Sequence, residues 1–291
     1  MNVTTKKYVI YTAVVGGYDD ILQPKVVDDR FDYVLFSNDI KENRVGVWQV
    51  RPITYQNDDN TRICRYIKTH PNELLPNYDF SIWMDANLQI CTSYIYERAI
   101  ELLNEEIIIS SMWHPVRNCI YEEAFAVVNM MVEHENIVVA WCHKLRKEKF
   151  PKHQGLCETN VMFRRHDDPI TSKVNALWWQ CIERYSRRDQ LSFNYVLWKL
   201  CIPCHYFFGE GKNARNTEHI QLVMHQNIYH NHCLIGNNEA WLMRYCWKNK
   251  EKSDAIAELY YRLYAYPFPK LWVAIAGQIY RIKYLIENHG K

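Results

Sequence analysis

The sequence lacks the features that mark several common protein classes. Its formal net charge is only +2, from 35 basic and 33 acidic residues, and no long run of one sign occurs, which argues against a nucleic-acid partner. No segment reaches the ~20 consecutive apolar residues that a membrane-spanning helix needs. There is no internal repeat and no low-complexity linker. We therefore expect a globular protein that is soluble or peripheral to a membrane.

The amino terminus lacks the pattern of a signal peptide. MNVTTKK is a short charged segment that leads directly into an apolar, β-branched run, without the apolar region and cleavage site of a secretory signal. We therefore expect a cytoplasmic protein whose 10 cysteines are reduced and mostly buried. The motif CIPCH at residues 201–205 matches the pattern of c-type haem attachment, but that attachment requires export, and a zinc knuckle would need a fourth ligand. We expect neither group and predict a strand there.

Aromatic residues are abundant. With 48% hydrophobic residues the chain can bury a large core, and its 10 Trp and 21 Tyr exceed what a core needs. Aromatic faces can stack on nucleobases and sugar rings. The alternative is an aromatic-rich core and interface.

Buried strands that end in polar loops predict an α/β sheet. Residues 8–15 form an apolar run that ends in Gly16 and Gly17, residues 33–36 end in Ser-Asn-Asp, and residues 80–84 end at Asp85. The glycine pair lacks the full dinucleotide-binding spacing. In such sheets ligands bind at the carboxyl ends of the strands.

Helices and further strands are expected between these runs. We predict helices over residues 61–70, 93–104, 172–184 and 191–200, a helical region over 121–149, and a strand over 107–110. Beyond about residue 254 the chain becomes an aromatic tail with basic flanks. We therefore expect a catalytic domain over 1–253 and a helical tail over 254–291.

The motif Asp85-Ala86-Asn87 is the strongest local signal for a metal site. Two oxygen-bearing side chains at this spacing can reach one Mg²⁺ or Mn²⁺ ion, which prefers hard oxygen ligands and shares them with phosphates. The alternative is a turn in which Asp85 or Asn87 caps a helix.

A cluster of cations on the helix over residues 61–70 could serve the same site. Arg62, Arg65 and Lys68 could stabilise the charge of a diphosphate leaving group. The alternative is a solvated basic helix face.

Long, ordered motifs then resemble a known family. The chain is similar to the glycosyltransferase-like domain shared by plant mucilage and ceramidase-type proteins and by bacterial polysaccharide-locus proteins. The resemblance covers about residues 8–200 and rests on YTAVVGGYDD, DYVLFSND, TRICRYIKTHPNELLPNYDFSIWMDANLQI, WHPVRNCIYEEA, GLCETNVMFRRH and YSRRDQLSFNYVLW. It implies a GT-A fold, a nucleotide-sugar donor, and a metal motif that falls on Asp85 and Asn87.

The resemblance also implies donor-binding and metal-binding residues. A nucleotide would lie at the ends of the first strands, and a more distant likeness to retaining galactosyltransferases places the sugar beside Asn160 and the pair Asp189-Gln190. That group takes a further metal ligand from a carboxyl-terminal histidine, for which we choose His225 before His232, against the alternative of an ordinary hydrogen-bonded histidine. The implied donor-binding set is Thr12, Val14, Gly16, Tyr18, Arg62, Arg65, Lys68, Asp85, Ala86, Asn87 and Asn160, with Mn²⁺ or Mg²⁺ as cofactor.

Catalytic and acceptor-binding candidates complete the site. Glu158 would share a strand face with Asn160 and is the leading carboxylate for base or oxocarbenium-stabilising chemistry, against a salt bridge to Arg164 or Arg165. Asp189 and Gln190 are the other catalytic candidates, although Asp189 could also cap the helix that follows it. The acceptor-binding candidates are His114, Arg117 and Arg188, with an ion pair between Arg117 and a neighbouring glutamate as the alternative.

The tail carries an amphipathic pattern. Its apolar face would contain Leu271, Ile275, Ile279, Ile282 and Ile286, with Lys270, Arg281 and Lys283 as positive charges. This combination suits a helix resting on an anionic membrane, where lipid-linked acceptors reside. Docking onto the core, or onto a second copy in a homodimer, is the alternative.

We therefore predict a retaining, metal-dependent glycosyltransferase. It would transfer a hexose or hexuronic acid from a nucleotide sugar, a UDP-sugar by expectation, to a glycan or lipid-linked glycan of capsule or O-antigen type. The alternatives are a metal-dependent hydrolase with ceramidase-like amide cleavage, which would turn over without a nucleotide, and a non-catalytic sugar-binding module.

Overall fold

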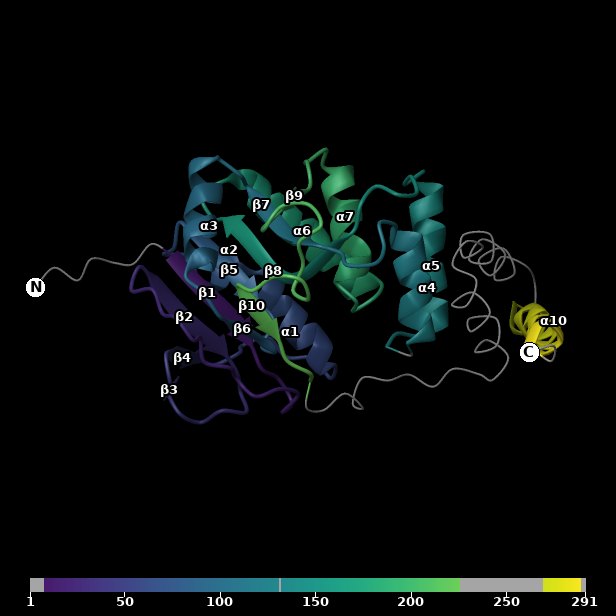
Figure 1. Ribbon diagram of the computed structural model, residues 1–291, viewed down its shortest axis with the longest axis horizontal. Helices are drawn as coiled ribbons and strands as arrows, with labels where there is room; N and C mark the ends of the chain where they lie inside the picture. Colours follow the sequence, from purple (N-terminus) through teal and green to yellow (C-terminus); the bar gives the residue numbers. More distant parts are fainter. Residues whose placement is uncertain (1–7, 131, 226–268, 289–291) are drawn as a thin grey trace, which may run out of the picture. The chain divides into compact units, whose positions relative to one another are not determined.

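The structure is a computed structural model that describes residues 8–130, 132–225 and 269–288 (Figure 1). The chain forms two compact units, Met1–Val116 with Gly155–His230, and Arg117–Gln154 with Asn231–Lys291. The domain boundary expected at residue 253 lies outside the described residues. The first unit contains the main sheet and all candidate donor-binding and catalytic residues.

An eight-stranded mixed sheet forms the centre of the first unit. The strand order is β3-β4-β2-β1-β5-β8-β7-β9, in which β4, β2, β1 and β5 run parallel while β3 and β8 run antiparallel to their neighbours. The predicted fold class, a Rossmann-like mixed sheet flanked by helices, is confirmed. The strands are β1 Tyr8–Ala13, β2 Phe31–Phe36, β3 Arg44–Val45, β4 Trp48–Arg51, β5 Phe80–Met84, β7 Ile109–Trp113, β8 Cys157–Arg165 and β9 His205–Tyr206.

Two helices of the first unit, α1 and α6, begin at a side-chain capping group. The Asp59 carboxylate accepts a hydrogen bond from the Thr61 amide at the start of α1, and Asp168 caps α6 in the same way, followed directly by Pro169. These caps satisfy amide groups that the first helical turn leaves without partners. The helices are α1 Asn60–Thr69, α2 Pro71–Leu74, α3 Tyr94–Asn104, α6 Pro169–Arg184 and α7 Gln190–Lys199.

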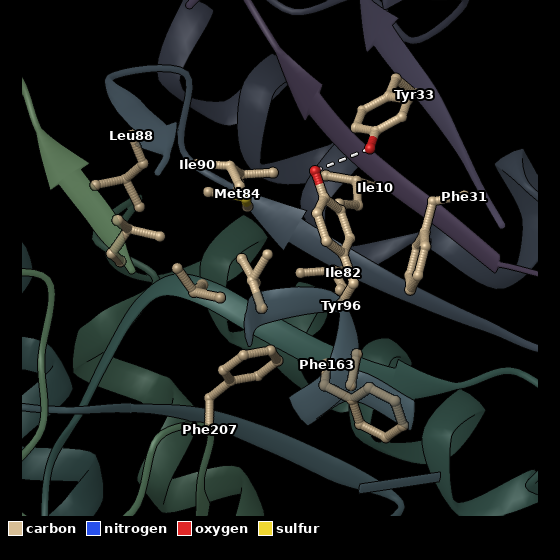
Figure 2. Packing of buried hydrophobic residues seen from close by; sticks show 14 of the residues in the cluster. Ile10, Phe31, Tyr33, Ile82, Met84, Leu88, Ile90, Tyr96, Phe163 and Phe207 are labelled. Carbon is tan, nitrogen blue, oxygen red and sulfur yellow. Dashed lines mark hydrogen bonds between the residues drawn. The ribbon is translucent and has the colours of Figure 1, made fainter. Parts of the chain in front are cut away.

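Alternation along the strands divides the core between the two faces of the sheet. Ile10 of β1 and Ile82 of β5 join a cluster with Tyr96 of α3, whose hydroxyl lies 2.9 Å from that of Tyr33 (Figure 2). The next residue of β1, Tyr11, points to the other face and donates a hydrogen bond to the Lys68 carbonyl of α1 over 3.0 Å. Both faces of the central strands are therefore buried, which explains their nearly continuous apolar sequences.

A second, two-stranded sheet joins a strand that lies between β5 and β7 in the chain to a strand that follows β9. Its strands, β6 Leu88–Ile90 and β10 Ile220–Leu222, pair antiparallel, with Leu88 opposite Leu222. Because β6 begins one residue after Asn87, this pairing holds the segment after β10 beside the predicted metal motif. Our sequence analysis did not predict either strand.

The second unit is helical in its described residues. Its helices are α4 Ile120–Asn129, α5 Glu135–Lys147 and α10 Pro269–Asn288. The helical region predicted over residues 121–149 therefore consists of two helices. The predicted apolar face of α10 is exposed at Leu271, Ile275, Ile279, Ile282 and Ile286. No helix in the described ranges is long and apolar enough to cross a membrane.

Two further predictions need correction. The strand predicted over residues 201–205 is confined to His205 and Tyr206, because Cys201 adopts a φ of 55° just after the end of α7. The strand predicted from residue 107 begins at Ile109, since the Ile107 amide instead donates to the Leu102 carbonyl at the end of α3.

Candidate functional site

The motif Asp85-Ala86-Asn87 forms a tight turn between β5 and β6. The Leu88 amide donates to the Asp85 carbonyl over 3.0 Å, and the Asp85 amide donates to the Asn160 carbonyl of β8 over 2.8 Å. Ala86 is buried in the core at the bend of this turn. Because a strand follows the turn, the alternative that Asp85 or Asn87 caps a helix is wrong.

His225 lies beside this turn although it is 138 residues away in the chain. Its Nε2 atom is 3.4 Å from Asn87 Nδ2, and its Nδ1 atom is 2.8 Å from the Asp19 carboxylate. The ring of Tyr18 lies 4.8 Å from the imidazole between centroids. A carboxylate that accepts from Nδ1–H fixes the tautomer in which Nε2 carries a lone pair. His232, the second choice, lies outside the described residues.

The donor set at this turn suits a divalent cation. Within the described residues no three His, Cys, Asp or Glu side chains gather closely enough to hold a metal ion by themselves. Asn87 donates its amide nitrogen to the Val223 carbonyl over 3.0 Å, which leaves its side-chain oxygen available. Mg²⁺ and Mn²⁺ are commonly held by one or two protein groups together with substrate phosphates. Asp85, Asn87 and His225 fit that pattern.

A buried ionic cluster lies next to the turn. Lys68 Nζ is 2.6 Å from Asp189 Oδ2, 3.5 Å from Asp85 Oδ1 and 3.2 Å from the Thr159 hydroxyl. Arg65 lies 2.9 Å from the other oxygen of Asp189. Burial alone would raise the pKa of Asp189, but the charges of Arg65 and Lys68 outweigh it and hold that pKa well below its usual range. Asp189 is therefore ionised.

The side chain of Asp189 does not cap α7. Only its backbone carbonyl takes part in the start of the helix, accepting from the Ser192 and Phe193 amides at 3.1 and 3.2 Å. The carboxylate instead binds Arg65, Lys68 and the Thr159 hydroxyl. The capping alternative is therefore wrong. Gln190, the first residue of α7, is half-buried next to this cluster.

The structure separates the three cations predicted to act together. Arg62 binds the carboxyl end of α6. It donates to the Ile182 carbonyl, to the Glu183 carbonyl over 3.2 Å and to the Tyr185 carbonyl over 3.0 Å. Arg65 and Lys68 are paired mainly with carboxylates. Their predicted role, offsetting phosphate charge, stays a prediction.

Glu158 pairs with a residue that the sequence did not suggest. Its Oε1 atom lies 2.5 Å from Arg215, in the loop after β9. The alternative partners are wrong, since Arg164 is fully buried against Tyr11 and Asn175 while Arg165 pairs with Asp167. The second Glu158 oxygen and the Asn160 side-chain oxygen are buried, and neither has a hydrogen bond within the described part of the chain. Each residue therefore keeps one buried acceptor oxygen that no described group uses.

The end of β1 forms a turn that needs glycine. Gly16 and Gly17 have φ values of 69° and 61°, and both amides donate to the Asp39 carboxylate, over 2.6 and 3.3 Å. A Cβ atom at residue 16 would lie 2.0 Å from Asn60 Nδ2. Of the other predicted donor residues here, the Val14 amide donates to the Phe36 carbonyl, and the buried Thr12 hydroxyl has no hydrogen bond among the described residues.

The predicted acceptor-binding residues are divided between the two units of the chain. His114 is buried, and its Nδ1 atom accepts from the Val116 amide over 3.2 Å. Arg188 precedes the buried Asp189 and adds to the positive charge around it. Arg117 belongs to the second unit, where it lies 2.6 Å from Glu123, so the ion pair predicted as its alternative is present.

The decisive comparison is with protein families. The model of the TOD1/MUCI70 glycosyltransferase-like domain matches residues 1–225. The chain belongs to this family. The resemblance inferred from the motifs is thereby confirmed, and every predicted site residue from Thr12 to His225 lies within the matched segment.

The names of two similar curated proteins state different activities. The chain is 23% identical over 216 residues to the "Probable hexosyltransferase MUCI70" of Arabidopsis thaliana, covering 65% of this chain and 36% of that protein. It is 24% identical over 223 residues to the "Alkaline ceramidase TOD1" of the same plant, covering 65% and 47%. The chain thus matches less than half the length of either. Among solved structures, the apo bifunctional glycosyltransferase WbbM aligns over 70% of this chain and 39% of its own, at 10% identity and a TM-score of 0.43.

Four residues of this TOD1/MUCI70 domain were missed by the sequence analysis. Asp19, Asp39, Thr159 and Arg215 contact predicted site residues through side chains that are distant in sequence. Asp19 and Asp39 lie in the loops that follow the buried strands β1 and β2, and this position was a usable signal. Nothing in the local sequence indicates the partners of Thr159 and Arg215.

Proposed function

We propose that this glycosyltransferase-like domain transfers a hexose or hexuronic acid from a UDP-sugar to a glycan acceptor, in cell-surface polysaccharide synthesis of capsule or O-antigen type. One observation carries the proposal. The turn Asp85-Ala86-Asn87 lies at the carboxyl end of a parallel strand with His225 beside it, and these oxygen-bearing and imidazole side chains could serve as metal ligands at the edge of an α/β sheet where ligands bind. The chain would act at the cytoplasmic face of the membrane.

The proposed reaction exchanges one bond at the anomeric carbon. The bond from that carbon to the β-phosphate oxygen breaks, and the nucleoside diphosphate leaves with the electron pair. The acceptor oxygen bonds to the carbon, and the proton that it loses passes to the leaving diphosphate. A divalent cation held by Asp85, Asn87 and His225 would act as a Lewis acid that stabilises the leaving diphosphate. We propose retention of configuration, following the resemblance to retaining galactosyltransferases.

Residues of β8 and α7 would contact the sugar. In the donor complex, the unpartnered oxygens of Glu158 and Asn160 would accept hydrogen bonds from sugar hydroxyls, and a carboxylate near the anomeric carbon would stabilise developing positive charge. Asp189 stays ionised through Arg65 and Lys68 and can act in the same way. Gln190 supplies an amide next to it. Lys68 also joins Asp189 to Asp85, so the sugar-binding and metal-binding groups are held by one ammonium group.

A thermal-shift titration tests the donor site. Purified chain is heated with nucleoside diphosphates and nucleotide sugars in the presence of Mn²⁺, Mg²⁺ or chelator. A ligand that binds only the folded state at a hundredfold excess over Kd should raise Tm by about 5 °C or more. We expect a metal-dependent shift with UDP that is lost in Asp85→Ala and retained in Asp167→Asn, a variant of an exposed carboxylate. No shift with any nucleotide would contradict the proposal.

Amide hydrolysis is the second candidate, because one relative is named an alkaline ceramidase. A metal at Asp85 could activate water for attack on an amide carbonyl. Fatty acid release from ceramide without any nucleotide, abolished in Asp85→Ala, would support it. Binding of nucleotide without release of UDP from any UDP-sugar and acceptor would instead identify a sugar-binding module.

A further inference from the structure

A hollow of about 450 Å³ lies in the first unit, formed by residues not assigned to donor, metal or catalysis. Its aromatic lining consists of Tyr94 at the start of α3, Phe208 after β9, and His219 before β10. Its polar lining includes Lys212, Thr217 and Glu218. The hollow therefore combines ring faces with hydrogen-bonding groups.

The three rings are fixed in place. The Tyr94 and His219 centroids lie 4.4 Å apart, and Phe208 lies 5.3 Å from His219 and 5.9 Å from Tyr94. The His219 Nδ1 atom is 2.9 Å from the Thr92 hydroxyl, and its carbonyl accepts from the Cys91 amide. All three residues are only half-buried, so part of each surface is open to a ligand. A preformed aromatic surface binds without a large ordering cost.

The polar groups of the hollow have free hydrogen-bonding capacity. Among the described residues, the ammonium of Lys212, the carboxylate of Glu218 and the hydroxyl of Tyr94 make no hydrogen bond or ion pair. They offer a cationic donor, an anionic acceptor and a group that does both. Ring faces beside such groups suit a ligand with an apolar face and an edge of hydroxyls. A pyranose ring has that form.

One loop connects the hollow to the candidate catalytic carboxylate. Residues 211–219 supply the polar lining of the hollow, and Arg215 in the same loop pairs with Glu158. The Asn216 side chain accepts from the Asn213 amide and donates to the Gly211 carbonyl, both over 2.8 Å, which stabilises the loop. The loop that lines the hollow therefore also contacts Glu158.

The position of the hollow relative to the metal turn supports an acceptor role over a nucleobase site. Two hydrogen bonds flank β6. The Val223 amide donates to the Asn87 carbonyl before this strand, and the Cys91 amide, four residues later in the chain, donates to the His219 carbonyl. Strand rise places these pairs about 13 Å apart. The nucleotide is expected at the ends of β1 and β2, which leaves the hollow for another part of the reaction.

We propose that this hollow is a carbohydrate subsite that holds one hexopyranose unit of the acceptor glycan. The acceptor role rests on the proposed glycosyl transfer, whereas sugar binding in the hollow can be measured without it. Tyr94 and Phe208 provide the stacking surface, and Lys212 and Glu218 bind hydroxyl groups.

Saturation-transfer difference NMR on the full chain tests this subsite. The probes are the methyl glycosides of glucose, galactose and glucuronic acid and short glucans, with uridine and UDP as competitors. We expect sugar C–H signals that fall at least fivefold in Tyr94→Ala and in the double variant Lys212→Ala/Glu218→Gln, whose two residues are exposed. Tyr55→Ala is the matched control, because Tyr55 is another half-buried ring, stacked on Tyr66 at 4.2 Å.

The outcomes separate this proposal from the proposed function. Sugar signals that persist in both hollow variants, or no signal with any probe, overturn the subsite even if UDP still gives a metal-dependent thermal shift. Displacement of the sugar by uridine in the absence of metal would also overturn the subsite, because this result would identify the hollow as a nucleoside site. Sugar binding lost in the hollow variants without any nucleotide shift would support the subsite and contradict the transferase.

Discussion

The ammonium of Lys68 lies 2.6 Å from the carboxylate of Asp189, and both side chains are buried. The same ammonium lies 3.5 Å from Asp85, so a residue of α1 connects the turn after β5 with the start of α7. With Arg65, the cluster contains two cations and two carboxylates. Its charges balance, so an added diphosphate would need a cation of its own.

Asp189→Asn should destabilise the fold strongly. Removing one charge of a buried pair leaves Arg65 and Lys68 without their partner, which costs about 3–5 kcal/mol. Because the folded-state pKa of Asp189 lies below the unfolded value, its contribution is present above pH ~4 and is lost as the pH falls further. Urea unfolding at pH 7 measures the loss, and at lower pH the difference from wild type should shrink. Asp167→Asn should change stability by less than about 1 kcal/mol.

Arg62 and Lys68 should differ in function although both lie on α1. Arg62→Met removes hydrogen bonds to the carbonyl groups that end α6 and should cost about 1–3 kcal/mol without changing nucleotide affinity. Lys68→Met should lower stability and also weaken metal-dependent UDP binding, because it frees Asp85 and Asp189 from their shared partner. Titration of each variant with UDP and metal, at a temperature below both melting temperatures, compares their nucleotide affinities. Equal nucleotide affinities would show that Lys68 has only a structural role.

His166 should make stability fall in mild acid. Burial and the charge of Arg164 lower its pKa to about 4, and in the neutral form its Nδ1–H donates to the Leu75 carbonyl while Nε2 lies 2.8 Å from the Ser81 hydroxyl. Because the unfolded state, with a histidine pKa of about 6.5, takes up a proton more readily than the folded state, the free energy of unfolding falls as the pH drops from 6.5 toward 4. At pH 5 the loss is about 2 kcal/mol. His166→Gln should flatten the unfolding free energy between pH 7 and 5. If the unfolding free energy of the variant depends on pH as steeply as that of the wild type, other groups cause the pH dependence.

Cys157 and Cys204 should form a disulfide under mild oxidation. Their sulfur atoms are 2.9 Å apart, and the Cys157 thiol lowers the pKa of Cys204. A Cys204 thiolate would attack oxidised glutathione, and Cys157 would then displace the bound glutathione, so that one disulfide and two reduced glutathiones form. Peptide mapping should find this link in wild type and in Cys201→Ser, which removes an exposed thiol. Glutathione retained on Cys204 would contradict the second step.

The exposed face of α10 should bind anionic vesicles. Ile279 and Ile282 are 58% and 57% exposed, and Arg281 and Lys283 add positive charge beside them. Co-sedimentation of the full chain with phosphatidylglycerol vesicles should be lost in Ile279→Asp/Ile282→Asp and should weaken in high salt. If wild type does not sediment but elutes as a dimer that the variant abolishes, the face is a subunit interface.

Local patterns predicted most of the first unit, because burial and helix periodicity are encoded within a few residues. The predicted strand over residues 80–84 coincides with β5, and the helix predicted over 61–70 differs from α1 by one residue at each end. The pairings of Lys68 with Asp189 and of His225 with Asp19 join residues more than 100 positions apart, and no periodicity records them. The strands β6 and β10, of three residues each, are too short to give an alternation pattern.

The pairing of β10 with β6 determines how short an active fragment can be. A fragment that ends with β9 would retain the whole main sheet, yet it would lack the strand that pairs with β6 and the histidine beside the metal turn. It would also lose the carbonyl of Val223 that orients the Asn87 amide. The smallest fragment that keeps these contacts of the Asp85–Asn87 turn therefore extends to residue 225, which is also the last residue of the family match.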